Sequence, residues 1–479
     1  MADVLDAVVV GSGASGMLVA SRLLDAGLSV LVLECGPLVR DKLPSCDRDK
    51  YEKLIAPVLP TTSPDWAWHG EGTPYDWQRV RAAGGRTLVW GGWCLRMDAH
   101  NHWDARAFGV PFPFAVGELD KHYHRVETLL GLREVPIEPP FDAVPRDLGV
   151  PVLPKRAAVG PCGCRAYVSL DRTRHVPLQP DAAVSRVLLD RRGRACGVAY
   201  VDVTTRTTHE LPARAVVLCA SPVETVRLLL ASAPGGLGRN PQLIGKGLTD
   251  HVLIGHVVLL PRPAPRPGTL APTERACTVA RFVNAGRGTR RSYRGGFTIE
   301  VRGPVATDTL PDDTLASLGV DRADAAGMSH LVIHAMGESG PNPQRWATVD
   351  PARADALGRP LPVIHFAWGD DEAAMVQDME QAVVSVADVL AVPGSRAVPL
   401  QVPLAGGGAG HEAGGCRMGR SAKTSVTDVT GAVRGVTGLY VADASLLPTA
   451  LDRPPTLTVM ALALNVADCV VEAMSRRDL

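Results

Sequence analysis

Residues 6–36, DAVVVGSGASGMLVASRLLDAGLSVLVLECG, decide the fold of this chain. Residues 7–10 form a short β-branched run, which is typical of a buried strand. The glycine-rich residues 11–16 follow, and apolar residues at helical spacing then continue to a helix stop at Gly27. Residues 29–34, SVLVLE, predict a second strand. The segment therefore predicts a strand, a turn, a helix and a second strand in close succession.

The turn in this unit has the pattern G-x-G-x-x-G, which predicts a dinucleotide-binding site. Gly11 would allow the tight turn, Gly13 would let the backbone approach a pyrophosphate, and Gly16 would let the helix pack on the strand. The pyrophosphate would lie at the helix N-terminus. Glu34 ends the second strand, where its carboxylate would accept hydrogen bonds from ribose hydroxyls and repel a 2′-phosphate. The motif alone does not separate FAD from NAD, but its place at the front of a long chain favours FAD.

The composition is that of a globular protein. The chain has 479 residues, 46% hydrophobic and 21% charged, with 50 basic and 50 acidic residues. This length suggests two or three domains, and the balanced charge argues against nucleic acid as a partner. The longest apolar runs look interrupted or too short to span a bilayer, so no membrane association is expected. The segment MADVLDAVVV lacks a basic region, so the sequence predicts no signal peptide and a cytoplasmic protein.

The ten cysteines form no regular framework. The tightest pair is Cys162 and Cys164, in PCGCR. A metal site needs more ligands, and the sequence has no second close pair, so we predict no metal. Reduced thiols are the simpler interpretation of cysteines in a reducing compartment.

The middle of the chain predicts a glycine-rich segment, a β-hairpin, a strand–helix unit and an antiparallel sheet. Residues 79–98, RVRAAGGRTLVWGGWCLRMD, carry two glycine pairs that indicate either backbone held close to a flat ligand or two ordinary turns. Residues 182–203 predict a β-hairpin, and residues 214–232 predict a strand followed by a helix. Strand-like pieces in residues 295–368 and an amphipathic helix in residues 370–391 predict a mostly antiparallel sheet with a covering helix. This region would face the substrate.

Two features of the C-terminal third stand out. His411 lies among glycines in residues 406–419, GGGAGHEAGGCRMG, where its ring could reach a ligand. Residues 438–471, GLYVADASLLPTALDRPPTLTVMALALNVADCVV, predict a strand, a loop and a long apolar helix. That helix begins at the two consecutive prolines Pro454 and Pro455.

Taken together, these features make the chain similar to the glucose–methanol–choline (GMC) oxidoreductases, a family of FAD-dependent alcohol oxidases and dehydrogenases. The resemblance covers nearly the whole chain and includes GGRTLVWGG, VVLCASPVETVRLLLAS, NPQLIGKGLTDH, GESGPNPQRWATVD and the C-terminal segments. The chain resembles the short bacterial form of the family, with some similarity to pyranose oxidases.

The resemblance implies an α/β fold, α+β overall, in which a Rossmann-like FAD-binding domain is interleaved with an antiparallel-sheet substrate domain. The FAD-binding domain would comprise residues 1–45, 76–110, 180–255 and 405–479. The substrate domain would comprise residues 46–75, 111–179 and 256–404.

The resemblance also implies roles for individual residues. His411 matches the active-site histidine of the family's H-x-x-G-x-C pattern, and in alcohol oxidation it would take the hydroxyl proton. The helix starting at Thr456 would direct its positive end at the flavin. The predicted cofactor-binding residues are Gly11, Ser12, Gly13, Ser15, Gly16, Glu34, Cys35, Gly84, Gly85, Trp90, Gly91, Val184, Ala220, Asp443, Ala444 and Thr456. Pyranose oxidases tether FAD through a histidine where this chain has Val89, so the resemblance implies non-covalent FAD.

One position departs from the family pattern. Relatives usually have Asn or His immediately before the residue matching Pro455, and this chain has Pro454, which has no polar side chain. His411 would then work alone, Asp452 or Arg453 would substitute, or the reaction would differ; Asp452 and Arg453 pairing with each other is the simpler interpretation.

The leading hypothesis is an FAD-dependent oxidoreductase that oxidises a CH–OH group of a polyol, sugar or specialised metabolite by hydride transfer to flavin N5. The alternatives are a GMC-fold flavoprotein with non-redox chemistry, such as a lyase or isomerase, and a catalytically silent FAD-binding protein. The sequence leaves the substrate and the electron acceptor open, whether dioxygen, a quinone or a protein.

Overall fold

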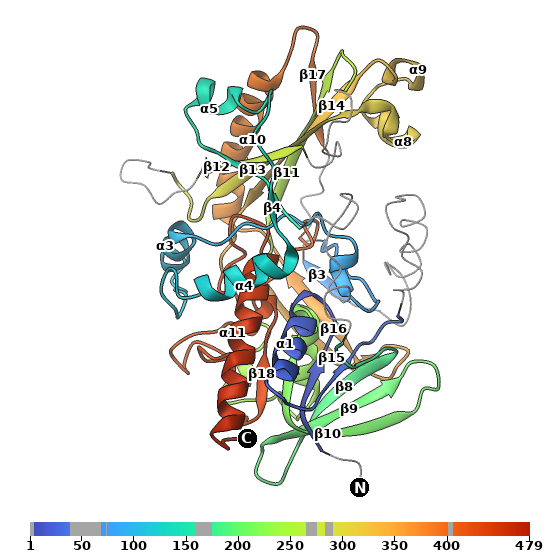
Figure 1. Ribbon diagram of the computed structural model, residues 1–479, viewed down its shortest axis with the longest axis vertical. Helices are drawn as coiled ribbons and strands as arrows, with labels where there is room; N and C mark the ends of the chain where they lie inside the picture. The colour runs from blue at the N-terminus through green and yellow to red at the C-terminus, as the bar shows by residue number, and fades with distance from the viewer. Residues whose placement is uncertain are drawn as a thin grey trace.

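The computed structural model describes residues 4–38, 69–72, 74–158, 175–264, 275–282, 291–400 and 406–479. The described chain forms two layered halves at opposite ends of an elongated molecule (Figure 1). One half is built on a seven-stranded sheet and the other on a six-stranded sheet. The first described strand and the C-terminus lie at the end that carries the seven-stranded sheet (Figure 1).

The seven-stranded sheet has the order β7-β2-β1-β10-β9-β8, with β18 also paired to β10. Its strands are β1 (Leu5–Val10), β2 (Val30–Leu33), β7 (Leu178–Gln179), β8 (Ala182–Leu189), β9 (Ala195–Asp202), β10 (Thr208–Leu218) and β18 (Leu439–Val441). β1 pairs in parallel with β2 and β10, whereas β8, β9 and β10 form an antiparallel meander. The predicted hairpin of residues 182–203 is therefore confirmed as β8 and β9.

Helices cover the parallel part of this sheet, and α1 (Ala14–Asp25) joins β1 to β2 as the sequence predicted. Because both faces of a parallel sheet are buried, its strands read as continuous apolar runs. The side chains of Ala7, Val8 and Val9 are accordingly fully buried. α7 (Pro222–Ala231) follows β10, and α11 (Thr456–Ser475) packs against α1 and α4 (Asp120–Leu130).

The helix α11 corrects one expectation. By length and composition it could cross a membrane, although the sequence had suggested that every apolar run was too short or interrupted. In the structure, 67% of its most apolar window is buried inside the protein, in the core shared with α1. This burial is what a core helix of a folded domain shows.

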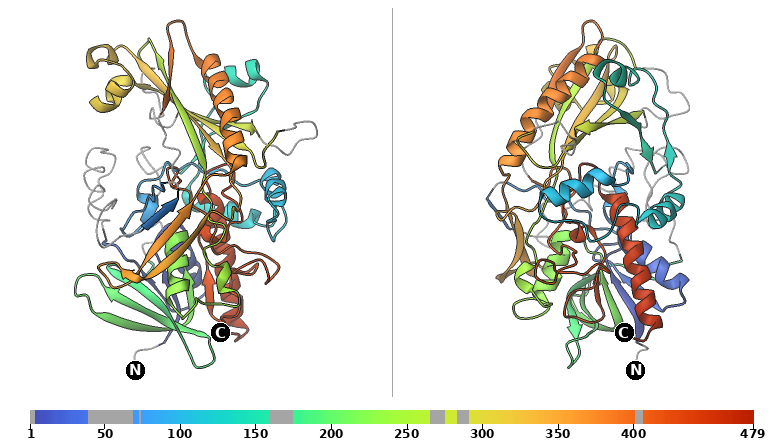
Figure 2. Two further views of the ribbon diagram at one scale, coloured as in Figure 1. Left: turned by 180° about the vertical axis from the view of Figure 1, so that it is seen from behind. Right: turned by 90° about the vertical axis from the view of Figure 1, so that its left-hand side faces the viewer.

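The six-stranded sheet is antiparallel throughout, with the order β17-β11-β14-β13-β12-β5. Its strands are β5 (Val152–Pro154), β11 (Val252–Leu260), β12 (Ala276–Phe282), β13 (Phe297–Ala306), β14 (Ser329–Gly337) and β17 (Arg396–Leu400). The helix α10 (Asp370–Leu390) lies along one face (Figure 2). The predicted antiparallel sheet with a covering helix is confirmed.

The remaining elements lie between the two sheets or at their edges (Figure 1). The last strand-like piece of residues 295–368 does not join the antiparallel sheet; it is β16 (Pro360–Phe366), which pairs with β15 (Trp346–Ala354) and β3 (His69–Gly72). The others are η4 (Gly85–Leu88), α3 (Ala99–Ala107), β4 (Arg133–Glu134), α5 (Ala143–Leu148), β6 (Arg156–Ala157), η5 (Pro241–Leu243), η7 (Thr307–Thr309), α8 (Asp312–Ser317), α9 (Arg322–Ala325) and η8 (Ala444–Leu446).

Candidate active site

A cavity of about 490 Å³ is lined by residues of both halves. From the seven-stranded half it receives the turn after β1, the end of β2 and the start of β8. From the six-stranded half it receives side chains of β11, β13 and β14. A cavity of this size, placed where two structural units meet, is a usual site for a small-molecule ligand.

The turn after β1 is shaped for close approach of a ligand. Gly11 has a φ of +99°, a conformation that favours glycine. A Cβ at Gly16 would lie 1.9 Å from the carbonyl oxygen of Gly11, so only glycine allows α1 to pack this close to the turn. A Cβ at Gly13 would meet nothing within 4 Å, which leaves its cavity side open.

The N-terminus of α1 is suited to an anionic group. No side-chain hydrogen bond caps its Gly13 end, and its first turn carries no acidic residue. The first backbone N–H groups of a helix lack partners within the helix, and the helix dipole favours negative charge beside them. This end of the cavity therefore fits the pyrophosphate of a dinucleotide.

Glu34 lies at the end of β2, with its carboxylate held by neighbouring donors. The backbone N–H and the hydroxyl of Ser12 donate to Oε2 at 3.0 and 2.7 Å, and the Gly36 N–H donates to Oε1 at 2.9 Å. Burial raises the pKa of Glu34, and these donors oppose the rise. The carboxylate lines the cavity beside the pyrophosphate end, as a ribose-binding acid would.

The loop around η4 lies against this turn. Gly85, Trp90 and Gly91 line the cavity, whereas Gly84 does not. The Gly84 N–H instead donates to the Ser12 hydroxyl at 3.0 Å and so ties the two glycine-rich loops together. Of the two interpretations of these glycine pairs, the structure therefore favours backbone held close to a ligand.

Arg86, in the same loop, clamps the chain next to His411. Its guanidinium donates to the Gly410 carbonyl at 2.5 Å, to Glu412 at 2.6 Å and to the Ser221 hydroxyl at 3.0 Å. The Ser221 hydroxyl in turn donates to Glu412 at 2.9 Å. Both neighbours of His411 in the chain are thereby fixed from the seven-stranded half.

His411 lines the cavity, and its only described hydrogen bond is to a second histidine, His251. The two Nδ1 atoms are 2.9 Å apart, and the rings meet edge to face at 85°. Burial, followed by the charges of His251, Arg86 and Arg302, lowers the pKa of His411 well below its usual value. His411 is consequently neutral at pH 7 and able to accept a proton.

Asp443 and Ala444 follow β18 and also line the cavity. The Asp443 carboxylate accepts from the N–H and hydroxyl of Ser445 at 2.9 and 2.6 Å, and from the Thr225 hydroxyl at 2.6 Å. Both carboxylate oxygens therefore already bind protein donors. Asp443 therefore holds the turn into η8 through Ser445 and joins that turn to α7 through Thr225.

The first turn of α11 closes another side of the cavity through Pro455, Thr456 and Val459. Pro455 is the N-cap of this helix, with a φ of −80°. The positive end of the helix dipole thus faces the cavity, where it favours negative charge that develops on a ligand.

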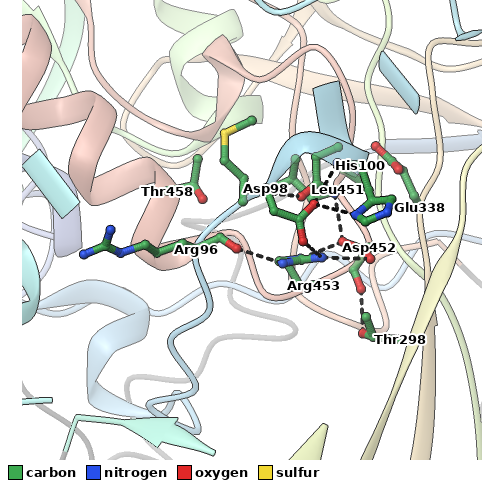
Figure 3. Close-up of polar contacts among 12 residues, drawn as sticks. Arg96, Asp98, His100, Thr298, Glu338, Leu451, Asp452, Arg453 and Thr458 are labelled. Atoms are coloured by element: carbon green, nitrogen blue, oxygen red, sulfur yellow. Dashed lines mark hydrogen bonds and ion pairs between the residues drawn. The ribbon is translucent and has the colours of Figure 1, made fainter. Parts of the chain in front are cut away.

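Asp452 and Arg453 do not take the place of the second catalytic side chain, and they lie outside the cavity lining together with Pro454. The Arg453 guanidinium donates to both Asp452 oxygens, at 2.7 and 3.1 Å (Figure 3). It also donates to the Arg96 carbonyl at 2.8 Å and pairs with Asp98 at 3.1 Å (Figure 3). The prediction that Asp452 and Arg453 pair with each other is confirmed.

A polar wall opposite the dinucleotide-binding loops was not predicted from the sequence. On β13, Phe297, Ile299 and Val301 pack in the core that contains α10, because side chains alternate between the two faces of a strand. Glu300 and Arg302 of the same strand line the cavity instead, together with Leu253, His334 and Met336 of neighbouring strands. The alternation in FTIEVRG was the sequence signal for this wall.

Glu300 is the acidic residue of this wall and is buried, at 1% exposure. One carboxylate oxygen accepts from Arg302 at 3.1 Å, and Oε1 has no hydrogen-bond partner among the described residues. Burial raises the pKa of Glu300 and lowers that of the adjacent His334 to about 4. The wall can therefore bind polar groups of a substrate, with His334 as a neutral ring.

Most of the predicted site residues meet at this one cavity. Those that line it are Gly11, Ser12, Gly13, Ser15, Glu34, Cys35, Gly85, Trp90, Gly91, Val184, Ala220, His411, Asp443, Ala444 and Thr456. Gly16 and Gly84 lie behind the lining and shape it through backbone packing.

The described residues contain no group of three or more His, Cys, Asp or Glu side chains that could hold a metal ion. The seven cysteines within them are free thiols. The pair Cys162 and Cys164 lies outside the described residues.

Comparisons with known proteins agree with this architecture. Models of the N-terminal and C-terminal parts of GMC oxidoreductases match residues 164–253 and 343–463. The chain is 26% identical to 2-methyl-1,2-propanediol dehydrogenase of Mycolicibacterium austroafricanum, covering 99% of this chain and 96% of the relative. It is 25% identical to paromamine 6′-oxidase of Streptomyces fradiae, covering 98% and 91%.

Among solved structures, a formate oxidase of Aspergillus oryzae RIB40, studied for the effect of a mutation on FAD modification, superposes with a TM-score of 0.65. That match is 16% identical and covers 99% of each chain, so it speaks for the fold alone.

The fold and the site together define an oxidoreductase, α+β overall, with a Rossmann-type FAD-binding domain. The models of both parts of the family match within residues 164–463, and the two relatives described above, matched over nearly their full length, are a dehydrogenase and an oxidase. The protein belongs to the GMC oxidoreductase family.

Proposed function

We propose that this protein binds FAD non-covalently and oxidises a CH–OH group of a polyol, sugar or specialised metabolite. One observation supports this above the others. His411, a neutral histidine, lies in the cavity between the dinucleotide-binding loops and the polar wall of the six-stranded sheet. A proton acceptor in that position is what oxidation of an alcohol requires.

Residues of the seven-stranded half would hold the cofactor. The N-terminus of α1 would bind the pyrophosphate, Glu34 the ribose, and Gly85, Trp90 and Gly91 would lie along the ring system. Bound flavin supplies the hydride acceptor, N5, and the positive end of α11 would favour the charge it gains. At Val89 the chain has no histidine through which FAD could be tethered, which supports non-covalent binding.

The protein's own residues would supply the remaining chemistry. His411 would take the hydroxyl proton, while Arg86 and Glu412 keep its backbone in place. The wall of Glu300, Arg302 and His334 would orient the substrate by hydrogen bonds. Such a wall suits a substrate with several hydroxyl or amino groups, and the two relatives, named for a diol and for paromamine, agree with this class.

Anaerobic mixing of the purified flavoprotein with a panel of diols, polyols, sugars and amino sugars tests the proposal. We expect at least one substrate to bleach the absorbance of oxidised flavin. Recovery on admission of air identifies an oxidase, and recovery only with an added quinone or acceptor protein identifies a dehydrogenase. Turnover of a substrate without any bleaching would overturn the proposal and support the lyase or isomerase alternative, which the proline at position 454 keeps in view.

A further inference from the structure

His251 lies directly behind His411, immediately before β11, and is only 2% exposed. Its Nε2 is 2.7 Å from the carbonyl oxygen of Ala450 and 3.1 Å from that of Leu451. A carbonyl oxygen can only accept a hydrogen bond, so Nε2 of His251 must carry the hydrogen that both carbonyls share.

This arrangement determines the other nitrogen of His251. Burial lowers the pKa of His251 to about 4, so the ring is neutral at pH 7 and carries a single hydrogen. Its Nδ1 then carries a lone pair and no hydrogen, and it lies 2.9 Å from Nδ1 of His411. The hydrogen in that contact must come from His411. A neutral His411 protonated at Nδ1 has its lone pair at Nε2.

We propose that His251 is a positioning residue that holds His411 in the Nδ1–H tautomer and thereby makes Nε2 the atom that receives the substrate's hydroxyl proton. The inference rests on the proposed oxidation, because it assigns the proton acceptor of that reaction to one nitrogen.

The surrounding backbone is built to keep the two histidines in register. Thr249 and Ala413 exchange reciprocal N–H to carbonyl bonds of 2.8 and 2.9 Å, which join the strand-like segments that carry His251 and His411. The Asp250 carboxylate accepts from the His251 N–H and from the Gly407 N–H, each at 2.7 Å. The loop before and the segment after His411 are therefore both anchored to residues 249–251.

The two carbonyls that receive Nε2–H belong to a strained turn. Leu451 has a φ of +65°, which an aliphatic side chain rarely adopts. His251 therefore links His411 to the turn that precedes α11. Pro454 of that turn has no polar side chain and does not line the cavity, so among the described residues the side-chain hydrogen-bond partner of His411 is His251.

The proton balance of the step is simple. The alcohol O–H bond breaks and its proton bonds to Nε2 of His411. The hydride leaves the carbon that carries this hydroxyl and goes to the bound cofactor. The imidazolium formed keeps its Nδ1–H bond to His251, so His251 neither gains nor loses a proton. In the opposite tautomer, Nε2 would already carry a hydrogen and could not accept another.

Three variants separate positioning from structural support. His251→Leu removes the acceptor, and His251→Asn places an amide oxygen near the position of Nδ1. His256→Leu removes a histidine from β11 that does not line the cavity and serves as the matched control. For each variant we would measure FAD content, thermal stability, and the limiting rate and half-saturating substrate concentration of anaerobic flavin reduction.

We expect His251→Leu to lower the limiting reduction rate about 100-fold, a typical contribution of a correctly protonated general base. The half-saturating concentration should change little, because His251 does not touch the substrate. His251→Asn should recover most of the rate, and the control should match the wild type. If His251→Leu were reduced as fast as the wild type, this inference would be overturned but the proposed function would stand. If no substrate reduced the flavin of the wild type, the proposed function itself would be overturned.

A second measurement does not depend on activity. In protein labelled with ¹⁵N-histidine, with His411→Ala used for assignment, we expect unprotonated Nε2 and protonated Nδ1 for His411, and the reverse for His251. A wild-type His411 that carries its hydrogen on Nε2 would refute the inference, whether or not the His251 variants fold.

Discussion

Replacing Arg453 by methionine should destabilise the protein, because it leaves a buried carboxylate without its counter-charge. Asp452 is fully buried, and Arg453 donates to both of its oxygens at 2.7 and 3.1 Å. The Asn101 side chain would still donate to Asp452 at 2.8 Å, but no cation would face it from position 453. Breaking a buried ion pair by removing one partner costs about 3–5 kcal/mol.

The electrostatic surroundings support a value in the upper half of that range. Burial raises the pKa of Asp452, but Arg453 and the hydrogen bond from Asn101 together bring the pKa in the folded protein below its usual value. The carboxyls of Asp104 and Glu338 lie near enough for their own pKa values to be raised by Asp452. With an unfolding entropy of about 2.1 cal/mol/K per residue, the chain should lose roughly 4–5 °C in Tm.

Thermal and urea unfolding of the wild type, Arg453→Met and the double variant Arg453→Met/Asp452→Leu test this reasoning. The double variant should regain much of the loss, because apolar side chains can replace a buried ion pair at little cost. Since neither residue lines the cavity, the rate of flavin reduction per folded molecule should stay unchanged. A single-variant loss below about 1 kcal/mol, or a double variant no better than the single one, would refute the reasoning.

Three further predictions follow from the cavity and its surroundings. Gly16→Ala should abolish FAD binding in a titration of apoprotein, because its Cβ would lie 1.9 Å from the Gly11 carbonyl oxygen; tight binding would contradict this. The pKa of His251 is about 4 in the folded protein and about 6.5 in the unfolded chain. Because the unfolded chain binds this proton first, the free energy of unfolding should fall by up to about 3 kcal/mol as the pH falls from 6.5 to 4. In urea titrations His251→Asn should flatten that decline, and an equal slope would argue against it. Glu300→Gln should raise KM for a hydroxyl-rich substrate about 10-fold with little change in kcat, and an unchanged KM would exclude Glu300 from binding.

The dinucleotide-binding end of the site could be predicted from the sequence because local rules determine it. Gly11 and Gly16 are required by a backbone conformation and a close contact, and both requirements depend on residues near them in the chain. Glu34 follows from the same unit, since it ends the next strand. His411 was found through the resemblance of its glycine-rich segment to a family pattern.

The substrate side could not be predicted, because tertiary contacts determine it. His251 reaches His411 across 160 positions, and the turn at Leu451 across 200. The segment ending in LTDH resembles the family, but no neighbouring residue in the sequence marks its histidine, His251, as the hydrogen-bond partner of His411. Glu300 was hidden in an alternating strand whose two faces look alike until the sheet is placed against the cavity.

The anomaly at Pro454 also needed the structure for its interpretation. From the sequence, Asp452 and Arg453 could have supplied the missing polar side chain. Their mutual pairing, together with their absence from the cavity lining, removes them from that role. The described hydrogen-bond partner of His411 is instead His251.

The most direct test of the account is the rate of anaerobic flavin reduction in His411→Ala compared with the wild type, measured with a substrate found in the panel. A general base contributes about 10²- to 10⁴-fold, so the variant should retain FAD and its fold but be reduced at least about 100-fold more slowly. A variant that binds FAD normally and is reduced at the wild-type rate would contradict the assignment of His411 as the proton acceptor.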